Sequence, residues 1–134
     1  MLLVTTPIEA TWGSNEDIMF LGEWCKLYER EEIWSERRYD VLQYHWDDRD
    51  KLRGDFNILQ KLNKKILKQL TQILNSLHSV NHSERYWEIL LGFWVNIFTG
   101  VIFDRWRMVE RAAETNKISK CCLLYTSDAA DEEE

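Results

Sequence analysis

The chain has 134 residues, of which 45% are hydrophobic and 30% are charged, and its formal net charge is −6. This length supports one folded core, and the balance of apolar and charged residues excludes an intrinsically disordered chain. The lack of a basic excess disfavours a nucleic-acid-binding protein, because neutralising phosphates requires many Lys and Arg residues.

Two further classes of protein are disfavoured. Three scattered cysteines provide neither a disulfide framework nor a zinc site, and no metal site is predicted. Residues 1–7 lack the basic segment and the long apolar segment of a signal peptide. We therefore expect a cytoplasmic protein.

The first half of the chain predicts an α/β region. Continuous apolar runs, rather than alternating ones, are typical of strands that are covered on both faces. The runs that we interpret as short parallel strands are residues 2–6, 18–21 and 41–44. The charge-rich segment between Lys26 and Arg38 predicts a short surface helix.

Two long helices are predicted in the second half. From Lys51 to Leu77, apolar residues recur every three or four positions, which is the pattern of an amphipathic helix. A second helix is predicted from Glu84 to about Ala113. Because the turn between them is only about five residues long, the two helices should pack as an antiparallel pair.

The second long helix is unusually apolar. Residues 89–103 contain no charged side chain, but these 15 residues are fewer than the roughly 20 that cross a bilayer. We therefore interpret it as a buried central helix and predict no transmembrane segment. Asp104 and Arg105, at its end, should form ion pairs or line a cleft.

The last residues differ in character from the rest. Residues 122–132 read Cys-Leu-Leu-Tyr-Thr-Ser-Asp-Ala-Ala-Asp-Glu, which looks like the translation of a sequencing-library adapter. On this interpretation residues 1–121 are a truncated N-terminal α/β domain, and residues 122–134 are a disordered addition. Without the five acidic residues of that addition the chain has 18 acidic and 17 basic residues, a net charge of −1. The alternative is a natural acidic tail.

Candidate ligand-binding residues follow the first two predicted strands, because ligands of open α/β sheets gather at the carboxyl ends of strands. Tryptophan rings serve either as core or as stacking surfaces for sugars. The candidate substrate-binding residues in these loops are Thr5, Thr6, Glu9, Trp12, Glu23 and Trp24. Cys25 is better explained as a small buried hydrophobic residue than as a nucleophile.

The densest cluster of chemically versatile side chains follows the third predicted strand. A His near a carboxylate can act as a general base, and a Trp face can stack on a sugar. The catalytic candidates are His45, Asp47 and Asp48, and Trp46 and Arg49 are candidate substrate-binding residues. The alternative for either Asp47 or Asp48 is that it caps the helix that begins near Lys51.

Several uncommon blocks in this order resemble a family of large transferases from bacterial O-antigen and surface-polysaccharide gene clusters. The matching blocks are residues 3–7 with Glu9, Thr11 and Trp12, then 20–28, 44–52, 82–92 and 103–106. The resemblance covers nearly all of residues 1–121. The catalytic residues of the family are not established, so the resemblance assigns no catalytic role to a particular residue.

The resemblance implies a glycosyltransferase-like architecture of two Rossmann-type halves. The N-terminal half would hold a carbohydrate or lipid-linked glycan acceptor, and the C-terminal half a nucleotide-activated sugar donor. The enzyme would then act in the cytoplasm or at the inner face of the membrane. Family members are several times longer, so this chain would be an incomplete N-terminal half, inactive without the C-terminal domain of the same chain.

An alternative function needs no catalysis. The apolar stripe of the first long helix could bind a partner, which would make the chain a small helical protein–protein interaction module. A complete module of this kind should fold cooperatively by itself.

Overall fold

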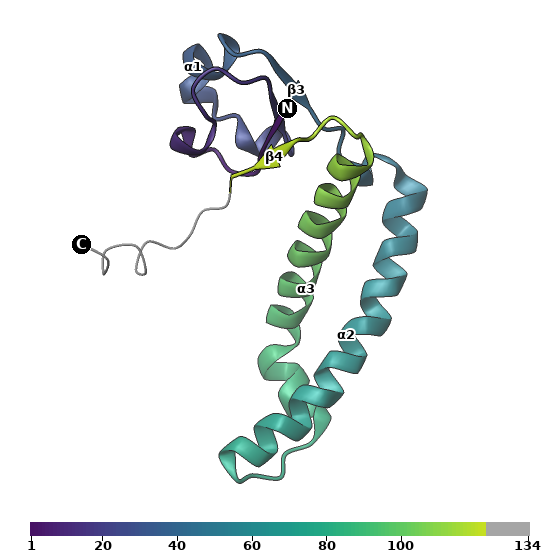
Figure 1. Cartoon of the computed structure of the whole chain (residues 1–134). Helices are drawn as coiled ribbons and strands as arrows, with labels where there is room; N and C mark the ends of the chain where they lie inside the picture. The colour runs from purple at the N-terminus through teal and green to yellow at the C-terminus, as the bar shows by residue number, and fades with distance from the viewer. Residues whose placement is uncertain (123–134) are drawn as a thin grey trace, which may run out of the picture. The chain divides into compact units, whose positions relative to one another are not determined.

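The computed structural model describes residues 1–122 (Figure 1). Residues 123–134, on which most of the adapter interpretation rests, lie outside the described residues. The chain divides into two compact units. We call residues 1–44 together with those from 108 onward the sheet unit, and residues 45–107 the helix-pair unit. Each unit is described by itself.

The sheet unit contains a four-stranded parallel sheet with strand order β3-β2-β1-β4. The strands are β1 (Leu2–Val4), β2 (Ile18–Phe20), β3 (Tyr39–Val41) and β4 (Lys120–Cys121). The predicted α/β class with short parallel strands is thereby confirmed. The sequence did not predict β4, because its two residues have exposed side chains and form no apolar run.

The core of the sheet unit is built on β1 and β2. All six of their residues are between 0 and 5% exposed. Both strands have a hydrogen-bonded neighbour on each side, so a continuous apolar run suits them, as the sequence indicated. Loop residues and the end of the last helix complete this core: Trp12, Leu21, Cys25, Leu42, Met108 and Ala112.

Short helical turns connect the strands. They are η1 (Glu9–Thr11), η2 (Glu23–Cys25), η3 (Tyr28–Arg30) and α1 (Glu31–Ser35). The helix α1 confirms the short surface helix predicted between Lys26 and Arg38, and its residues are exposed or half-buried. The indole nitrogen of Trp34 donates a hydrogen bond to the Leu27 carbonyl at 2.8 Å, which holds α1 against the preceding loop.

Two long helices, α2 (Arg49–His78) and α3 (Glu84–Glu114), lie side by side (Figure 1). Asp48 caps α2, because its carboxylate accepts hydrogen bonds from the backbone N–H groups of Asp50 and Lys51. At the other end Ser79 adopts the left-handed conformation that commonly ends a helix. The Asn75 side chain then closes the turn by hydrogen bonds with the backbone of His82.

Polar side chains join α2 to α3 within the helix-pair unit. Asn63 of α2 donates a hydrogen bond to Asn96 of α3 and accepts one from Thr99. Nearer the turn, the indole nitrogen of Trp87 donates to Asn75 at 2.9 Å. Such directional bonds fix the pairing of the two helices more strictly than apolar contact alone, because a shift of one helix would break them.

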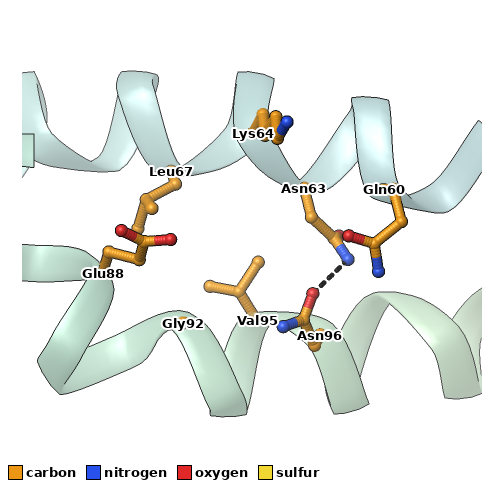
Figure 2. Close-up of a pocket in the computed structure, with 8 residues that line it drawn as sticks. All are labelled: Gln60, Asn63, Lys64, Leu67, Glu88, Gly92, Val95 and Asn96. Carbon is orange, nitrogen blue, oxygen red and sulfur yellow. Dashed lines mark hydrogen bonds between the residues drawn. The ribbon is translucent and has the colours of Figure 1, made fainter. Parts of the chain in front are cut away.

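One side of the helix pair carries a small groove of about 100 Å³, lined by polar and apolar residues (Figure 2). Its lining residues are Gln60, Asn63, Lys64 and Leu67 of α2 and Glu88, Gly92, Val95 and Asn96 of α3. Figure 2 shows Glu88 and Lys64 at its margins and the hydrogen bond between Asn63 and Asn96 across it. A groove of this size accommodates water molecules rather than a sugar.

The prediction that the second long helix is buried was wrong. Phe93 is 79% exposed and Ile89 is 68% exposed, and much of the uncharged segment is similarly open. The helix α2 can cover only one stripe of α3, and the other faces of α3 remain uncovered. By length and composition alone α3 could cross a membrane, with a mean hydropathy of 1.5 over 18 residues.

Candidate functional site

A chain of polar contacts occupies one end of the helix-pair unit. The Nε2 atom of His45 lies 2.8 Å from Oδ1 of Asp104, and its Nδ1 atom lies 3.1 Å from Nζ of Lys51. Lys51 continues to Oδ2 of Asp55 at 2.7 Å. The Trp46 indole nitrogen donates to the same Asp55 oxygen at 2.9 Å. These five residues form one connected network, which we call the His45 network.

Local sequence explains how the His45 network is assembled. The 3₁₀ turn η4 (His45–Asp47) directly precedes α2, so the His45 ring is held over the first turns of that helix. Lys51 and Asp55 are four residues apart on α2 and therefore lie on one face. Asp104 comes from α3, where it directly follows the uncharged segment.

For a neutral His45 ring, the contacts favour a proton on Nε2. An ammonium group has no acceptor capacity, so Nδ1 accepts from Lys51 and Nε2 donates to Asp104. Arg105 adds an ion pair with the second oxygen of Asp104 at 3.1 Å. A His–carboxylate pair with this tautomer is the arrangement that orients a general base.

The side chain of His45 is enclosed by its neighbours, and its catalytic role stays a prediction. The side chain of His45 is 1% exposed, and its Nδ1 lone pair faces Lys51. Asp104 is also buried, at 8% exposure. A reacting group could therefore reach the ring only after Lys51 moved aside.

Electrostatics stabilise the outer end of the His45 network. Burial raises the pKa of Asp55, but hydrogen bonds from Lys51 and Trp46, with the positive charge of Lys51, outweigh it. The net effect holds the pKa of Asp55 below its ordinary value of 3.8. Asp55 is therefore a stable carboxylate that fixes Lys51 and Trp46.

Neighbouring side chains contact the Trp46 ring, which was predicted to stack on a sugar. Its ring lies 4.6 Å from the His45 ring and 6.4 Å from the Phe103 ring, with an interplanar angle of 15° to Phe103. Its N–H group is bonded to Asp55. The indole is thus held by neighbours, and stacking of a sugar on Trp46 remains a prediction.

The other candidates in this cluster have separate positions. The capping alternative is confirmed for Asp48, whose carboxylate accepts from two backbone N–H groups of α2. Asp47 and Arg49 have exposed side chains. Their part in a substrate site stays a prediction.

In the sheet unit, the loop after β1 brings several predicted residues together. Thr6 accepts a hydrogen bond from the Trp12 indole through its carbonyl and lies 3.5 Å from the Thr11 hydroxyl. Thr5 is half-buried at the end of β1. Trp12 is only 2% exposed and meets Phe20 edge to face at 5.2 Å, so it belongs to the core. The Thr5 and Thr6 backbone is consequently well anchored.

Glu9 in the same loop has a partner that the sequence did not reveal. Two nitrogen atoms of Arg30 bond its two carboxylate oxygens at 2.5 and 2.7 Å. The hydrogen bond from Arg30 lowers the pKa of Glu9 and outweighs the opposing effect of desolvation, and the positive charge of Arg30 acts in the same direction as the hydrogen bond. Glu9 and Arg30 therefore form an exposed bidentate ion pair at the carboxyl edge of the sheet.

The loop after β2 lies beside the loop after β1. Leu21 donates its backbone N–H to the Val4 carbonyl at 2.9 Å, and the buried Cys25 thiol donates to the same oxygen at 3.5 Å. Cys25 is fully buried, which confirms the interpretation of this residue as a small buried hydrophobic residue.

The other two candidates in the loop after β2 have different surroundings. Trp24 packs so closely on Gly22 that a Cβ atom on Gly22 would lie 2.0 Å from the Trp24 ring. Glu23 is mostly exposed and pairs with Lys26 at 2.9 Å.

Sequence reasoning missed several residues of these arrangements. Arg30, Lys51 and Asp55 were not proposed as site residues, although the spacing of Lys51 and Asp55 on one helix was a usable signal. Asp104 was expected to pair or to line a cleft, but nothing in the sequence pointed to His45 as its partner. Within residues 1–122, no cluster of three or more His, Cys, Asp or Glu is arranged to hold a metal ion.

The comparison with protein families completes this description. The family model described as LIC12162 family transferase matches residues 1–130 of the chain. The chain belongs to this family. Comparison with curated proteins and with solved structures gave no match. The LIC12162 family match supports the transferase part of the sequence interpretation, and it covers both units of the structure.

Proposed function

We propose that this LIC12162 family protein contributes the acceptor side of a glycosyltransferase that builds O-antigen or another surface polysaccharide. The donor would be a nucleotide-activated sugar, and the acceptor a carbohydrate or a lipid-linked glycan. The observation that carries the proposal is the pair of adjacent loops after β1 and β2 in a chain whose family is a transferase family. The donor would bind a second half of the enzyme.

The strand order supports a Rossmann-like sheet. The order β3-β2-β1-β4, all parallel, is the order of the first four strands in the doubly wound nucleotide-binding fold. In such sheets the strand order reverses between β1 and β4, because successive strands are added on opposite sides of β1, and ligands bind outside the carboxyl ends of the strands at that point. Thr5 and Thr6, directly after β1, border this position.

The chemistry of the two loops suits a sugar. The Thr5 and Thr6 hydroxyls and the Glu23 carboxylate offer hydrogen bonds to sugar hydroxyl groups. The half-buried Trp24 supplies a ring edge or face for the apolar side of a pyranose. In this proposal Trp12 supports the loop after β1, and the Glu9–Arg30 pair supports or extends the site.

The His45 network would position the start of α2. Its polar groups are largely buried and already paired, so we assign them no proton transfer. For Asp48, a single substitution can distinguish its role as the cap of α2 from a role in the substrate site. Asp48→Asn keeps the capping oxygen but removes the negative charge. Loss of function without loss of stability in this variant would identify a role of Asp48 in the site.

The proposal is tested in a bacterium that carries a gene of this family. Deletion of the gene should shorten or abolish the surface polysaccharide seen on gels, and a plasmid copy should restore it. Glu23→Gln in the full-length protein should slow restoration by about tenfold, because a charge-assisted hydrogen bond contributes about 1.5–3 kcal/mol.

The matched control is Glu29→Gln, which removes the same charge from an exposed position in η3. It should restore the polysaccharide as the wild type does. An unchanged polysaccharide after deletion would overturn the proposed function. Equal restoration by both variants would remove Glu23 from the acceptor site.

A further inference from the structure

We propose that the helix-pair unit binds the surface of an anionic lipid bilayer through the apolar side of α2 and α3. This inference does not rest on the proposed reaction, because it follows from the exposed surface and the charges of residues 56–103. A protein with this surface would be a peripheral membrane protein whose helix pair lies along the bilayer.

The first observation is the extent of exposed apolar surface. Exposed apolar patches of this kind mark contact sites for membranes or partners rather than ordinary protein surface. The side chains that form the patch are at least 40% exposed: Ile58, Leu62 and Ile73 of α2, and Leu90, Trp94, Ile97, Phe98, Val101 and Ile102 of α3. We call this set the apolar face.

The helix pair separates polar from apolar side chains. Residues two positions apart on an α-helix point about 200° apart. Ile58 and Leu62 are each two positions from Gln60, and Trp94 and Phe98 are each two positions from Asn96. Because Gln60 and Asn96 line the groove (Figure 2), these four apolar side chains project away from it.

Charge complementarity selects the lipid surface among possible occupants. Residues 56–83 contain Lys61, Lys64, Lys65 and Lys68 and no acidic residue, although the whole chain has a net charge of −6. All four lysines are exposed. Lys61 and Lys65 lie three positions after Ile58 and Leu62, so they border the apolar face. Apolar side chains edged by lysines are the pattern of helices that lie on anionic membranes.

The geometry favours helices that lie on the bilayer over a helix that crosses it. The uncharged segment 89–103 is about 22 Å long as a helix, whereas the hydrocarbon core is about 30 Å thick. Asp104, at the end of the segment, is buried against His45 and paired with Arg105. This fixed polar end would have to enter the hydrocarbon if α3 crossed the membrane.

Vesicle flotation tests the binding directly. The 134-residue chain is mixed with vesicles of phosphatidylcholine alone or with 30 mol% phosphatidylglycerol (about one anionic lipid in three), at low and high salt. We expect binding to the anionic vesicles that weakens as salt rises, because the lysine contribution is screened. Equal binding to neutral vesicles, or no binding to either, would overturn the proposal.

Two pairs of variants locate the contact. Lys61→Glu with Lys68→Glu should weaken binding to anionic vesicles by at least about tenfold. Arg38→Glu with Arg53→Glu changes the net charge equally but lies outside residues 56–83, so it should have a much smaller effect. Equal losses in the two double variants would overturn the assignment to residues 56–83.

The apolar contribution is tested on exposed rings. Trp94→Ser with Phe98→Ser removes a stacked pair whose centroids are 4.8 Å apart, and it should abolish vesicle binding. Tyr28→Ser with Ile33→Ser removes exposed apolar groups of the sheet unit and should leave binding intact. Circular dichroism checks that the helical content of each variant is that of the wild type.

Tryptophan fluorescence reports directly on contact between the protein and the acyl chains. Lipids brominated in the acyl chain should quench tryptophan fluorescence, and Trp94→Phe should lose a share of that quenching.

Carbonate extraction distinguishes a helix pair on the membrane surface from a helix that crosses the membrane. Release of the bound protein by alkaline carbonate is the expected result for a helix pair on the surface. Resistance to carbonate would show a crossing helix, and a defined dimer that ignores vesicles would show that a second copy covers the apolar face. Either result would overturn the proposal.

Discussion

The strands β1 and β2 and the uncharged segment 89–103 of α3 are apolar runs with opposite environments. Every residue of the two strands is at most 5% exposed. In α3, Phe93, Trp94 and Ile97 are between 50 and 79% exposed. Apolar runs in the sequence are therefore buried in one unit and exposed in the other.

The physical reason lies in the number of covered faces. A central strand of a parallel sheet has neighbours on both edges and is packed on both faces, so all of its side chains are enclosed. A helix that meets one other helix buries only a stripe of its surface. Packing in the core of this chain therefore does not explain the apolar residues of α3. We propose that contact with a membrane explains them.

The largest expected effect comes from exchanging Phe for Ala in the two environments. Phe20 is fully buried and meets the rings of Trp12 and Tyr39 at 5.2 and 5.5 Å. Phe20→Ala should lower the free energy of unfolding by about 3–5 kcal/mol, because it leaves a cavity in the core. Phe93→Ala should change it by less than about 0.5 kcal/mol. Urea denaturation measures both, and similar losses would contradict the contrast between strands and helix.

A second prediction concerns the buried carboxylate of the otherwise exposed helix. Asp104→Ala leaves the Nε2–H group of His45 without its acceptor and should destabilise the protein by about 2–3 kcal/mol. Asp50→Ala is the control, since its side chain is 96% exposed. A loss that is no larger for Asp104 than for Asp50 would show that the His45 network does not hold the helix pair together.

The smallest effect is a pH dependence of stability. Because Asp55 has a folded-state pKa below 3.8, its ionised form favours the folded protein above that pH. This contribution is lost as the pH falls through the folded-state pKa. The free energy of unfolding should therefore decrease more steeply between pH 6 and pH 3 in the wild type than in Asp55→Asn. Parallel curves for the two proteins would contradict the role of Asp55 as a fixed carboxylate.

Much of the candidate site was accessible from sequence. Turn-forming residues after each apolar run located the two strand-end loops, because the ends of parallel strands expose their loops at one edge. The cap by Asp48 was also foreseeable, since aspartate before a helical run is a common N-cap. Glu9 and Arg30 are 21 positions apart, and His45 and Asp104 are 59 positions apart. No local pattern in the sequence predicts pairings over such distances.

The sequence by itself determined the local elements of this protein: short buried strands, a short surface helix and two long helices. Hydrophobic periodicity and turn-forming residues act over a few positions, so they can be recognised in the sequence alone. Only the tertiary structure decided that Lys120–Cys121 joins β1, that His45 is enclosed between Asp104 and Lys51, and that α3 is exposed. These outcomes depend on which surfaces meet in three dimensions, and apolar content alone does not specify the surface that covers it.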